Sequence, residues 1–519
     1  MRDCLAILPL MAALALPAYP QGGRGGRGQA AGPPAAEAPA AAAPAAPAPK
    51  VEEKTSSTSH TIEIGGQSIK YTATAGTVAL RKEDGTATAS MFYVAYTKDG
   101  VSDLSHRPLT FAFNGGPGSS SVWLQMGALG PKRVAMDAEG KALPPPSKLV
   151  DNEYSILDLT DLVFIDPVST GYSRAAPEST AASFHGFTGD LQSVGEFIRL
   201  YATRHTRWAS PKFLAGESYG TTRAAALSGY LQQTLGMDLN GIVLISSVLN
   251  FGAISFDAGN DLPYITFLPT YAATAWYHKK LAKDLQAAGL EKVVEEARRY
   301  AGGAYLAALF KGDGLTAEER AAVVKNVARL TGLTPRFIEE CNLRVSGQRF
   351  AKELLRDERR TVGRYDGRLE GSDRDAAGAS PEYDPSYASV QGPFTAAFNQ
   401  YVRGELNFED DIPYEILTDR VSPWNYREFE NRYVNVAETL RSAMTQNPAL
   451  RVYVACGYYD MATPFFSAEY TLNHMLLDPG LRSHISLGYY EAGHMLYTHL
   501  KSLAKAKQDI AKFMTASLP

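Results

Sequence analysis

The segment KFLAGESYGTTRAAAL, residues 212–227, constrains the fold more than any other part of the sequence. An apolar run ends at Gly216, Ser218 stands between Gly216 and Gly220, and an alanine-rich segment with helical character follows. Glycines around a residue at a strand-to-helix junction permit a turn that is too tight for flanking side chains. Such a turn exposes the middle side chain at the carboxyl edge of a sheet, beside a helix N-terminus. The segment predicts a nucleophilic Ser218; a serine that merely separates two glycines is the alternative.

Short apolar runs recur along the chain and are typical of central strands that are covered on both faces. They occupy residues 109–113, 162–165, 213–215, 242–246 and 452–455. Helical stretches lie between several of them, for example at residues 189–205 and 221–235. This alternation predicts an α/β protein with a mostly parallel central sheet and helices on both faces.

Two regions depart from the alternation. Residues 60–96 alternate between apolar and polar side chains between turn signals, which predicts antiparallel hairpins. From about residue 271 to residue 360 the chain reads as helix after helix, which predicts a helical insertion over one end of the sheet. A few additional surface helices are the alternative. We therefore place the first part of the core at residues 59–270, the helical insertion (cap) at 271–395 and the second part of the core at 396–519.

The N-terminus predicts export. Residues 1–20 combine Arg2, an apolar run and small residues near Ala18, as a secretory signal peptide does. The apolar run is short for a membrane span, so we favour cleavage over a retained anchor. Residues 21–58 are dominated by Gly, Ala and Pro as far as residue 50, and we expect a disordered tether. A periplasmic or extracellular protein is expected, with no stable membrane insertion after signal cleavage.

Charge and composition exclude several other functions. The net charge of -4 gives no reason to expect nucleic acid or an anionic membrane as a partner. The sequence has no HExxH motif, CxxC pair or P-loop, so we expect neither a metal nor a cofactor. Cys341 and Cys456 remain after signal cleavage and are free to pair in an exported protein. Cys456 lies in an apolar run and has the character of a small buried hydrophobe. The sequence predicts no particular oligomeric state.

A nucleophilic serine needs a base, and the base needs an acid that orients it. In sheets of this kind the acid and the base follow the serine in that order, each after a later strand. The run VYVACGYYD ends in Asp460, and ISLGYYEAGH ends in His494. We therefore expect Ser218, Asp460 and His494 to form a catalytic triad. Asp166 also ends a strand, but it precedes Ser218 and is a poor candidate for the acid.

A glycine-rich turn follows the apolar run of FAFNGGPGSSS, residues 111–121. Such a turn presents backbone N–H groups to the negative oxygen of a tetrahedral intermediate. Gly116 is the first expected donor, and the residue after the nucleophile, Tyr219, is the second. By itself the turn reads as a tight loop, but beside the predicted triad it reads as an oxyanion hole.

Four motifs together resemble the serine carboxypeptidase family. NGGPGSSS at 114–121, DPVSTGYS at 166–173, GESYGT at 216–221 and AGHM at 492–495 occur in the order of that family. The resemblance runs from Phe111 to the C-terminus and implies an α/β-hydrolase fold with an inserted helical region, in an exported bacterial member. It implies release of C-terminal residues from peptides through an acyl-enzyme, with the triad and oxyanion hole named above. It also implies that Asn114 and Glu217 bind the terminal carboxylate of the substrate.

The sequence departs from the family at three positions. Ala128 stands where the family has a second acid beside the Glu217 position, Ala112 replaces a tryptophan, and Ser119 replaces a cysteine. An ionised Glu217 would repel a carboxylate, whereas a protonated one donates a hydrogen bond to it. Because the partner acid is absent, we expect activity nearer neutral pH than the acidic range that the family favours.

Two other classes of function fit the same residues. An esterase or an acyltransferase would use the same triad, and the loss of the acid at Ala128 favours this alternative. Asn114 and Glu217 instead favour a substrate that bears a carboxylate. A catalytically silent binding protein on the same fold is the third possibility, and the complete triad argues against it.

Overall fold

The computed structural model describes residues 51–518. The predicted signal peptide and the predicted tether as far as residue 50 lie outside the described residues. The end of the predicted tether is wrong, because β1 (Thr55–Ile64) begins at Thr55 rather than after residue 58. Residues 55–58 pair with β2 (Gln67–Arg81) along the ladder, and their Ser and Thr side chains are compatible with that pairing. Among residues 51–518, no helix combines the length and the hydropathy that a membrane crossing requires.

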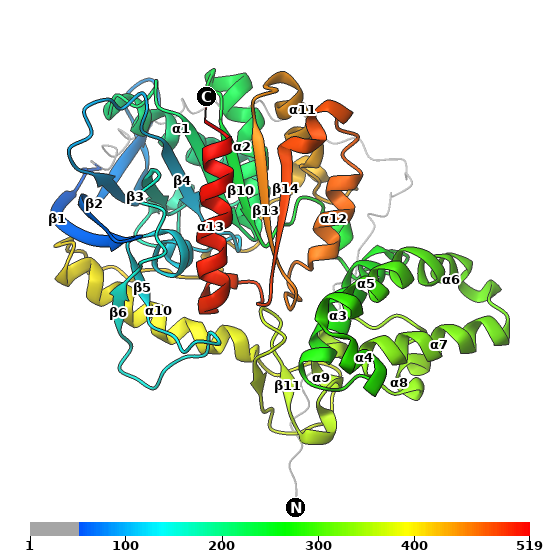
Figure 1. Cartoon of the computed structure of the whole chain (residues 1–519). Coiled ribbons are helices and arrows are strands. Elements are labelled where there is room, and N and C mark those ends of the chain that lie inside the picture. Colours follow the sequence, from blue (N-terminus) through cyan, green and yellow to red (C-terminus); the bar gives the residue numbers. More distant parts are fainter. Residues whose placement is uncertain (1–50, 519) are drawn as a thin grey trace, which may run out of the picture. The chain divides into compact units, whose positions relative to one another are not determined.

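Three long antiparallel strands form one edge of the sheet, which confirms the hairpins predicted for residues 60–96. β1 and β2 are joined through Gly65 and Gly66, whose φ values of 58° and 76° suit a two-residue hairpin turn. β2 pairs with β3 (Ala87–Lys98), and β3 pairs antiparallel with β7 (Asp161–Ile165). The hairpins therefore extend the central sheet, as the blue strands of Figure 1 show.

Six parallel strands form the centre of the sheet, in the order β7-β4-β9-β10-β13-β14. The five not yet given are β4 (Leu109–Phe113), β9 (Lys212–Glu217), β10 (Gly241–Ile245), β13 (Arg451–Gly457) and β14 (Ile485–Tyr490). All five predicted apolar runs fall on these strands. Every residue of β4, β7, β9 and β10 is buried, as expected for strands covered on both faces. Short strands are β5 (Lys132–Val134), β6 (Leu149–Asp151), β8 (Arg174–Ala175), β11 (Thr361–Val362) and β12 (Glu370–Gly371).

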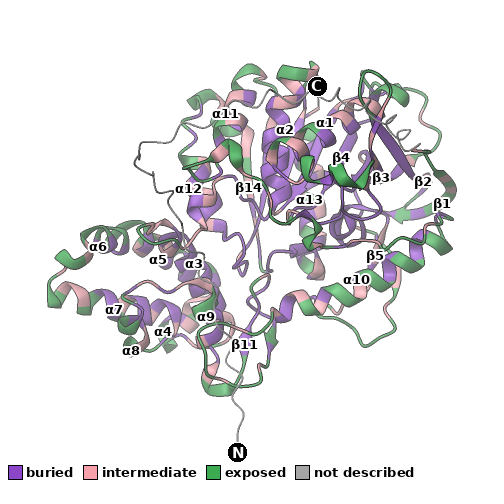
Figure 2. Ribbon diagram, turned by 180° about the vertical axis from the view of Figure 1, so that it is seen from behind, coloured by how far each residue is buried: buried purple, intermediate pink, exposed green. Residues whose placement is uncertain are grey.

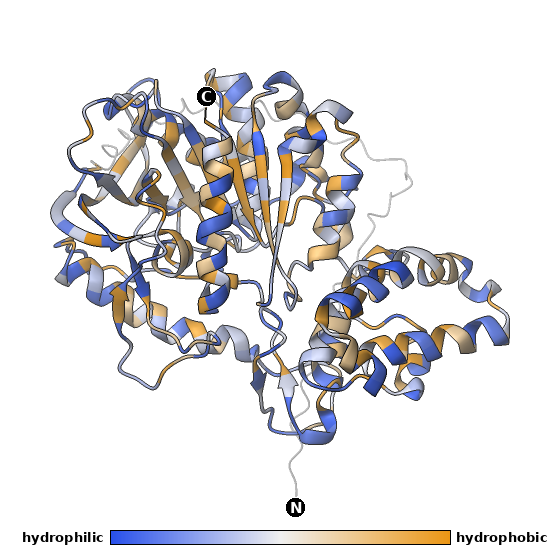
Figure 3. Ribbon diagram, viewed as in Figure 1, coloured by the Kyte–Doolittle hydropathy of each residue, from blue (hydrophilic) through white to orange (hydrophobic). Residues whose placement is uncertain are grey.

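Helices cover both faces of this sheet. One face packs against α1 (Phe187–Arg204), α2 (Tyr219–Leu235), α11 (Ala437–Gln446) and α12 (Phe465–Asn473). The other packs against α10 (Pro385–Gly404) and α13 (Leu500–Ala516). Figure 2 shows the buried strands between these helices, and Figure 3 shows hydrophobic residues concentrated along them. The predicted α/β-hydrolase architecture is confirmed.

The chain leaves the sheet after β10 and returns at β13, and between them it builds a helical insertion with its own apolar core. Its helices are α3 (Leu262–Tyr277), α4 (Lys283–Ala288), α5 (Leu290–Tyr300), α6 (Leu306–Lys311), α7 (Ala317–Thr331), α8 (Pro335–Glu340) and α9 (Gly347–Glu353).

The predicted limits of the insertion, 271 and 395, both need correction. α3 begins at Leu262, and Pro263 and Pro269 within it obscure the helical pattern. The limit at 395 divides α10, which packs on the sheet and belongs to the core. In Figure 1 helices α4–α8 lie past the lower end of α12 and to one side of the ends of the strands. The segment that reaches the strand ends is the chain around Arg364 and Tyr365, where the backbone N–H of His494 donates to the Tyr365 carbonyl at 2.6 Å.

Candidate active site

Ser218 stands on the sharp turn that the sequence predicts. It separates β9 from α2 and has φ 59° and ψ -130°, a backbone conformation that side chains rarely adopt. A Cβ at Gly216 would lie 2.2 Å from the Gly220 carbonyl oxygen, and a Cβ at Gly220 would lie 2.7 Å from the Phe113 carbonyl oxygen. Only glycine therefore fits at these two positions, two residues before and two residues after the serine. The Ser218 N–H donates to the Ile245 carbonyl at 3.0 Å, which fixes the turn to β10.

The predicted acid and base meet at the ends of the next two strands. Asp460 follows β13 and His494 follows β14, and His494 Nδ1 lies 2.8 Å from Asp460 Oδ2. The other oxygen, Asp460 Oδ1, accepts from the backbone N–H groups of Ala462 and Thr463 at 2.8 and 2.9 Å. The Thr463 hydroxyl donates to Asp460 Oδ2 at 2.8 Å. Four contacts thus hold the carboxylate, and the carboxylate holds the imidazole.

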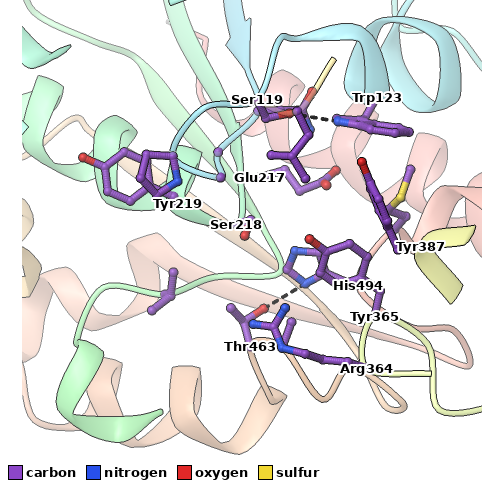
Figure 4. Close-up of a pocket in the computed structure, with 18 of the residues that line it drawn as sticks. Ser119, Trp123, Glu217, Ser218, Tyr219, Arg364, Tyr365, Tyr387, Thr463 and His494 are labelled. Atoms are coloured by element: carbon purple, nitrogen blue, oxygen red, sulfur yellow. Dashed lines mark hydrogen bonds between the residues drawn. The ribbon is translucent and has the colours of Figure 1, made fainter. Parts of the chain in front are cut away.

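The surroundings of His494 keep its ring in place and tune its basicity. Tyr365 stacks on the ring with centroids 5.0 Å apart. Burial lowers the pKa of His494, but the charge and hydrogen bond of Asp460, together with Glu217, raise it above its ordinary value. Ser218 and His494 line the same cavity, of about 160 Å³ (Figure 4). The structure therefore brings the three predicted triad residues together.

The two residues predicted to form an oxyanion hole are close to the same cavity. Gly116 and Tyr219 both line it, and among the described residues neither N–H has an acceptor. The two segments approach so closely that a Cβ at Gly115 would lie 2.4 Å from the Tyr219 nitrogen. Arg223, buried on α2, donates to the Asn114 carbonyl at 2.6 Å and pairs with Asp190 at 2.8 Å. This ion pair connects the helix after the nucleophile to the glycine-rich turn.

Asn114 and Glu217, the predicted carboxylate-binding pair, also line the cavity. Asn114 Oδ1 accepts from the Leu124 N–H at 3.0 Å, while Asn114 Nδ2 is buried without a partner. Glu217 Oε2 is likewise buried without a partner. Burial raises the pKa of Glu217 to about 7, against the opposing effect of the neighbouring His494. Glu217 is therefore a carboxyl group that holds its proton at mildly acidic pH.

The remaining candidates have structural surroundings. Asp166 Oδ1 accepts from the Ser121 N–H at 2.8 Å, so this buried acid fixes the loop after β4 rather than the histidine. Cys341 and Cys456 are both buried and free, so they do not pair. Cys456 lies within β13, which confirms its interpretation as a small buried hydrophobe.

Several residues of the site escaped the sequence analysis. Thr463 is the most accessible to prediction, because a threonine three residues after an aspartate is a recurrent local hydrogen-bonding pattern. Tyr365 and Arg364 reach the cavity from the far end of the insertion and carry no local signal. Among the described residues, Arg364 has no ion pair, and its guanidinium lies 5.5 Å from the centroid of the Tyr365 ring.

Comparison with known proteins agrees with the geometry. The family model described as serine carboxypeptidase matches residues 66–484, which include Ser218 and Asp460 and end before His494. Pheromone-processing carboxypeptidase KEX1 of Yarrowia lipolytica is 31% identical over 145 residues, which are 27% of this chain and 22% of that protein. Serine carboxypeptidase-like 16 of Arabidopsis thaliana is 32% identical over 127 residues, 24% of this chain and 28% of that protein. Each alignment thus spans less than a third of the relative.

A solved structure extends the likeness to the whole fold. The crystal structure of Kex1Δp, a prohormone-processing carboxypeptidase from Saccharomyces cerevisiae, superposes with a TM-score of 0.53 at 16% identity. It covers 86% of this chain and 91% of that chain. The family model covers most of the sequence. This protein belongs to the serine carboxypeptidase family.

Proposed function

We propose that this protein releases C-terminal residues from peptides through an acyl-enzyme intermediate. The observation that carries the proposal is the position of Asn114 and Glu217 beside Ser218 in the wall of the cavity, where Asn114 Nδ2 is buried without a partner. A buried polar atom without a partner costs about 1–3 kcal/mol. Such atoms at the wall of a catalytic cavity mark the place where a polar group of the substrate binds.

The triad then performs acyl transfer in two halves. Ser218 Oγ attacks the carbonyl carbon of the last peptide bond while His494 Nε2 takes its proton, and Asp460 stabilises the imidazolium. The N–H groups of Gly116 and Tyr219 stabilise the oxyanion. The C–N bond breaks as His494 returns the proton to the leaving amine. Water then attacks the ester carbon of the acylated serine, with His494 again as the base. The bond from that carbon to Ser218 Oγ breaks as His494 returns the proton to Oγ, and the shortened peptide leaves.

Recognition of the carboxylate limits cleavage to the last residue. Asn114 Nδ2 donates one hydrogen bond to the substrate carboxylate, and protonated Glu217 donates a second. Because the free carboxylate lies one residue beyond the scissile carbonyl, its capture places the last peptide bond at Ser218. Glu217 donates only below its pKa of about 7, and His494 acts as a base only above its own raised pKa. Peptide cleavage is therefore expected to peak near neutral pH.

A second cavity, of about 850 Å³, adjoins the first and supports a peptide substrate. The two cavities share Ile254, Arg364 and Ala462 in their walls. The small cavity holds the residues at the scissile bond, and the large one offers room for upstream residues of the peptide. A simple ester would leave this second cavity unused.

The alternative is an esterase or an acyltransferase. It is favoured by one observation, the buried Ala128 at the position of the second acid of the family. Without that acid, selection of a terminal carboxylate rests on Asn114 and Glu217.

We further propose that the protein is exported to the periplasm or the extracellular space. The proposal is supported by the charged, apolar and small-residue pattern of residues 1–20 and the Gly-, Ala- and Pro-rich stretch that follows. N-terminal sequencing of the protein from a culture would test it. A mature protein that begins near residue 20 supports export, and an intact Met1 contradicts it.

A mass-spectrometric time course with N-blocked peptides tests the activity. Stepwise loss of C-terminal residues by the wild type, absent with Ser218→Ala, is the expected result. Intact peptides together with Ser218-dependent hydrolysis of a simple ester would replace the peptidase proposal with the esterase or acyltransferase alternative.

A further inference from the structure

Glu217 has a buried neighbour that the sequence analysis did not single out. Tyr497 follows His494 by three residues and is 2% exposed. Its hydroxyl, like Asn114 Nδ2 and Glu217 Oε2, is buried without a hydrogen-bond partner. The Tyr497 hydroxyl and the Asn114 amide both act on Glu217, where they oppose the effect of burial on its pKa. Three unsatisfied polar atoms therefore belong to one cluster, at one end of the active site.

The ring of Tyr497 occupies space that a small residue, Gly127, leaves open. A Cβ at Gly127 would lie 2.4 Å from Cε2 and 2.6 Å from Cδ2 of this ring. Gly127 is followed by Ala128, in a π-helical turn over Leu124–Leu129 whose residues are all buried. A side chain at residue 127 would collide with the ring. Gly127 and the large Tyr497 are thus complementary in volume.

We propose that Tyr497 is the positioning residue of the carboxylate site and takes the place of the second acid that Ala128 lacks. The Tyr497 hydroxyl donates to Oε2 of Glu217, which leaves the proton of Glu217 on Oε1 for donation to the substrate carboxylate. This inference rests on the proposed carboxypeptidase function. It assigns Tyr497 a role through Glu217, and Tyr497 itself is not among the residues that line the catalytic cavity.

The exchange of an acid for a tyrosine has a chemical consequence. A second carboxylic acid changes charge in the acidic range, whereas burial raises the pKa of Tyr497 far above its ordinary value of about 10. Tyr497 therefore remains a neutral donor at every pH at which His494 is a base. The titratable groups that act on Glu217 are then His494, Asp460 and Tyr497, and Glu217 in turn acts on Tyr365. Carboxylate capture depends on one proton, that of Glu217.

The first test compares Tyr497→Phe with the wild type on two substrates, an N-blocked peptide with a free carboxylate and a simple ester without one. We expect kcat/KM for the peptide to fall about tenfold to 100-fold and that for the ester to stay unchanged. The alkaline limb of the peptide pH profile is expected to move to higher pH, because the variant loses a donor that favours ionised Glu217. Tyr401→Phe is the matched control, since it removes another buried hydroxyl, one that accepts from the Tyr96 hydroxyl at 3.2 Å and is not among the residues that line the catalytic cavity.

The second test keeps the hydroxyl and displaces the ring. Gly127→Ala puts a methyl group against Tyr497, and it should reproduce the selective loss on the peptide at an unchanged ester rate. Thermal unfolding of each variant separates this loss from misfolding.

The outcomes separate the two proposals. An equal loss on both substrates, or an alkaline limb that stays in place in Tyr497→Phe, would overturn the role of Tyr497 and leave the carboxypeptidase proposal standing. A wild type that cleaves free and amidated peptides equally well would overturn both.

Discussion

The two ends of the active site differ in how many of their polar atoms have a hydrogen-bond partner within the protein. At the triad, Asp460 receives contacts from His494, Ala462 and Thr463, and the protein provides every partner. At the carboxylate site, Asn114 Nδ2 is buried without a partner, and the proposed bond from Tyr497 occupies only one oxygen of Glu217. The first end is complete by itself, whereas the second keeps donors for a substrate. Generic acyl-transfer chemistry therefore resides at one end, and selection of the substrate resides at the other.

This division predicts two classes of variant. Changes at the triad should abolish cleavage of every substrate, because each substrate uses the same bonds. Changes at the carboxylate site should act on free-acid peptides and spare esters.

The largest effect is expected for Ser218→Ala. Loss of the nucleophile should lower kcat by about 10⁶-fold on peptide and ester alike. Steady-state kinetics on both substrates measures this. Ser228→Ala is the control on the same helix, since its hydroxyl donates only to the Ala225 carbonyl within α2. If Ser218→Ala retained activity on either substrate, another nucleophile would have to be sought.

A smaller but still general loss is expected for Asp460→Asn. The amide cannot hold His494 in the tautomer that the reaction needs, and kcat should fall about 10⁴-fold on both substrates. Asp166→Asn is the matched control, because its oxygen can still accept from the Ser121 N–H. If Asp166→Asn lost activity and Asp460→Asn kept it, Asp166 rather than Asp460 would be the acid of the triad.

Among the variants that should affect only free-acid peptides, the largest effect is expected for Asn114→Ala. Removal of a donor to a charged group costs about 1.5–3 kcal/mol, so kcat/KM for a free-acid peptide should fall about tenfold to 100-fold while ester hydrolysis persists. Arg364→Gln tests the competing binding site, since Arg364 is a cation in the same cavity. A loss of peptide cleavage in Arg364→Gln, with none in Asn114→Ala, would move carboxylate recognition to the arginine.

The smallest effect is a change in pH dependence. The wild type should give a bell-shaped profile on peptides, with an acid limb from His494 and an alkaline limb from Glu217, whose pKa is about 7. Glu217→Gln should remove the alkaline limb. An optimum below about pH 5 for the wild type would contradict this assignment.

The same contrast explains what could be predicted from the sequence. Ser218, Asp460 and His494 each follow an apolar strand and obey a fixed order, so local pattern and topology suffice to identify them. Tyr497 has no such signal, because its role depends on the volume left at Gly127 by a segment far away in the sequence. The predicted start of the insertion was wrong for a related reason. The prolines of α3 interrupt the helical sequence pattern, but tertiary packing stabilises the helix.

The proposed function requires the protein to recognise the free carboxylate of its substrate. The most direct test is the ratio of kcat/KM for one N-blocked peptide with a free C-terminus to that for the same peptide with an amidated C-terminus, measured at neutral pH. Capture by Asn114 and Glu217 predicts a ratio of at least about 100. A ratio near one, with both reactions abolished in Ser218→Ala, would show a working triad without carboxylate recognition and would overturn the carboxypeptidase proposal.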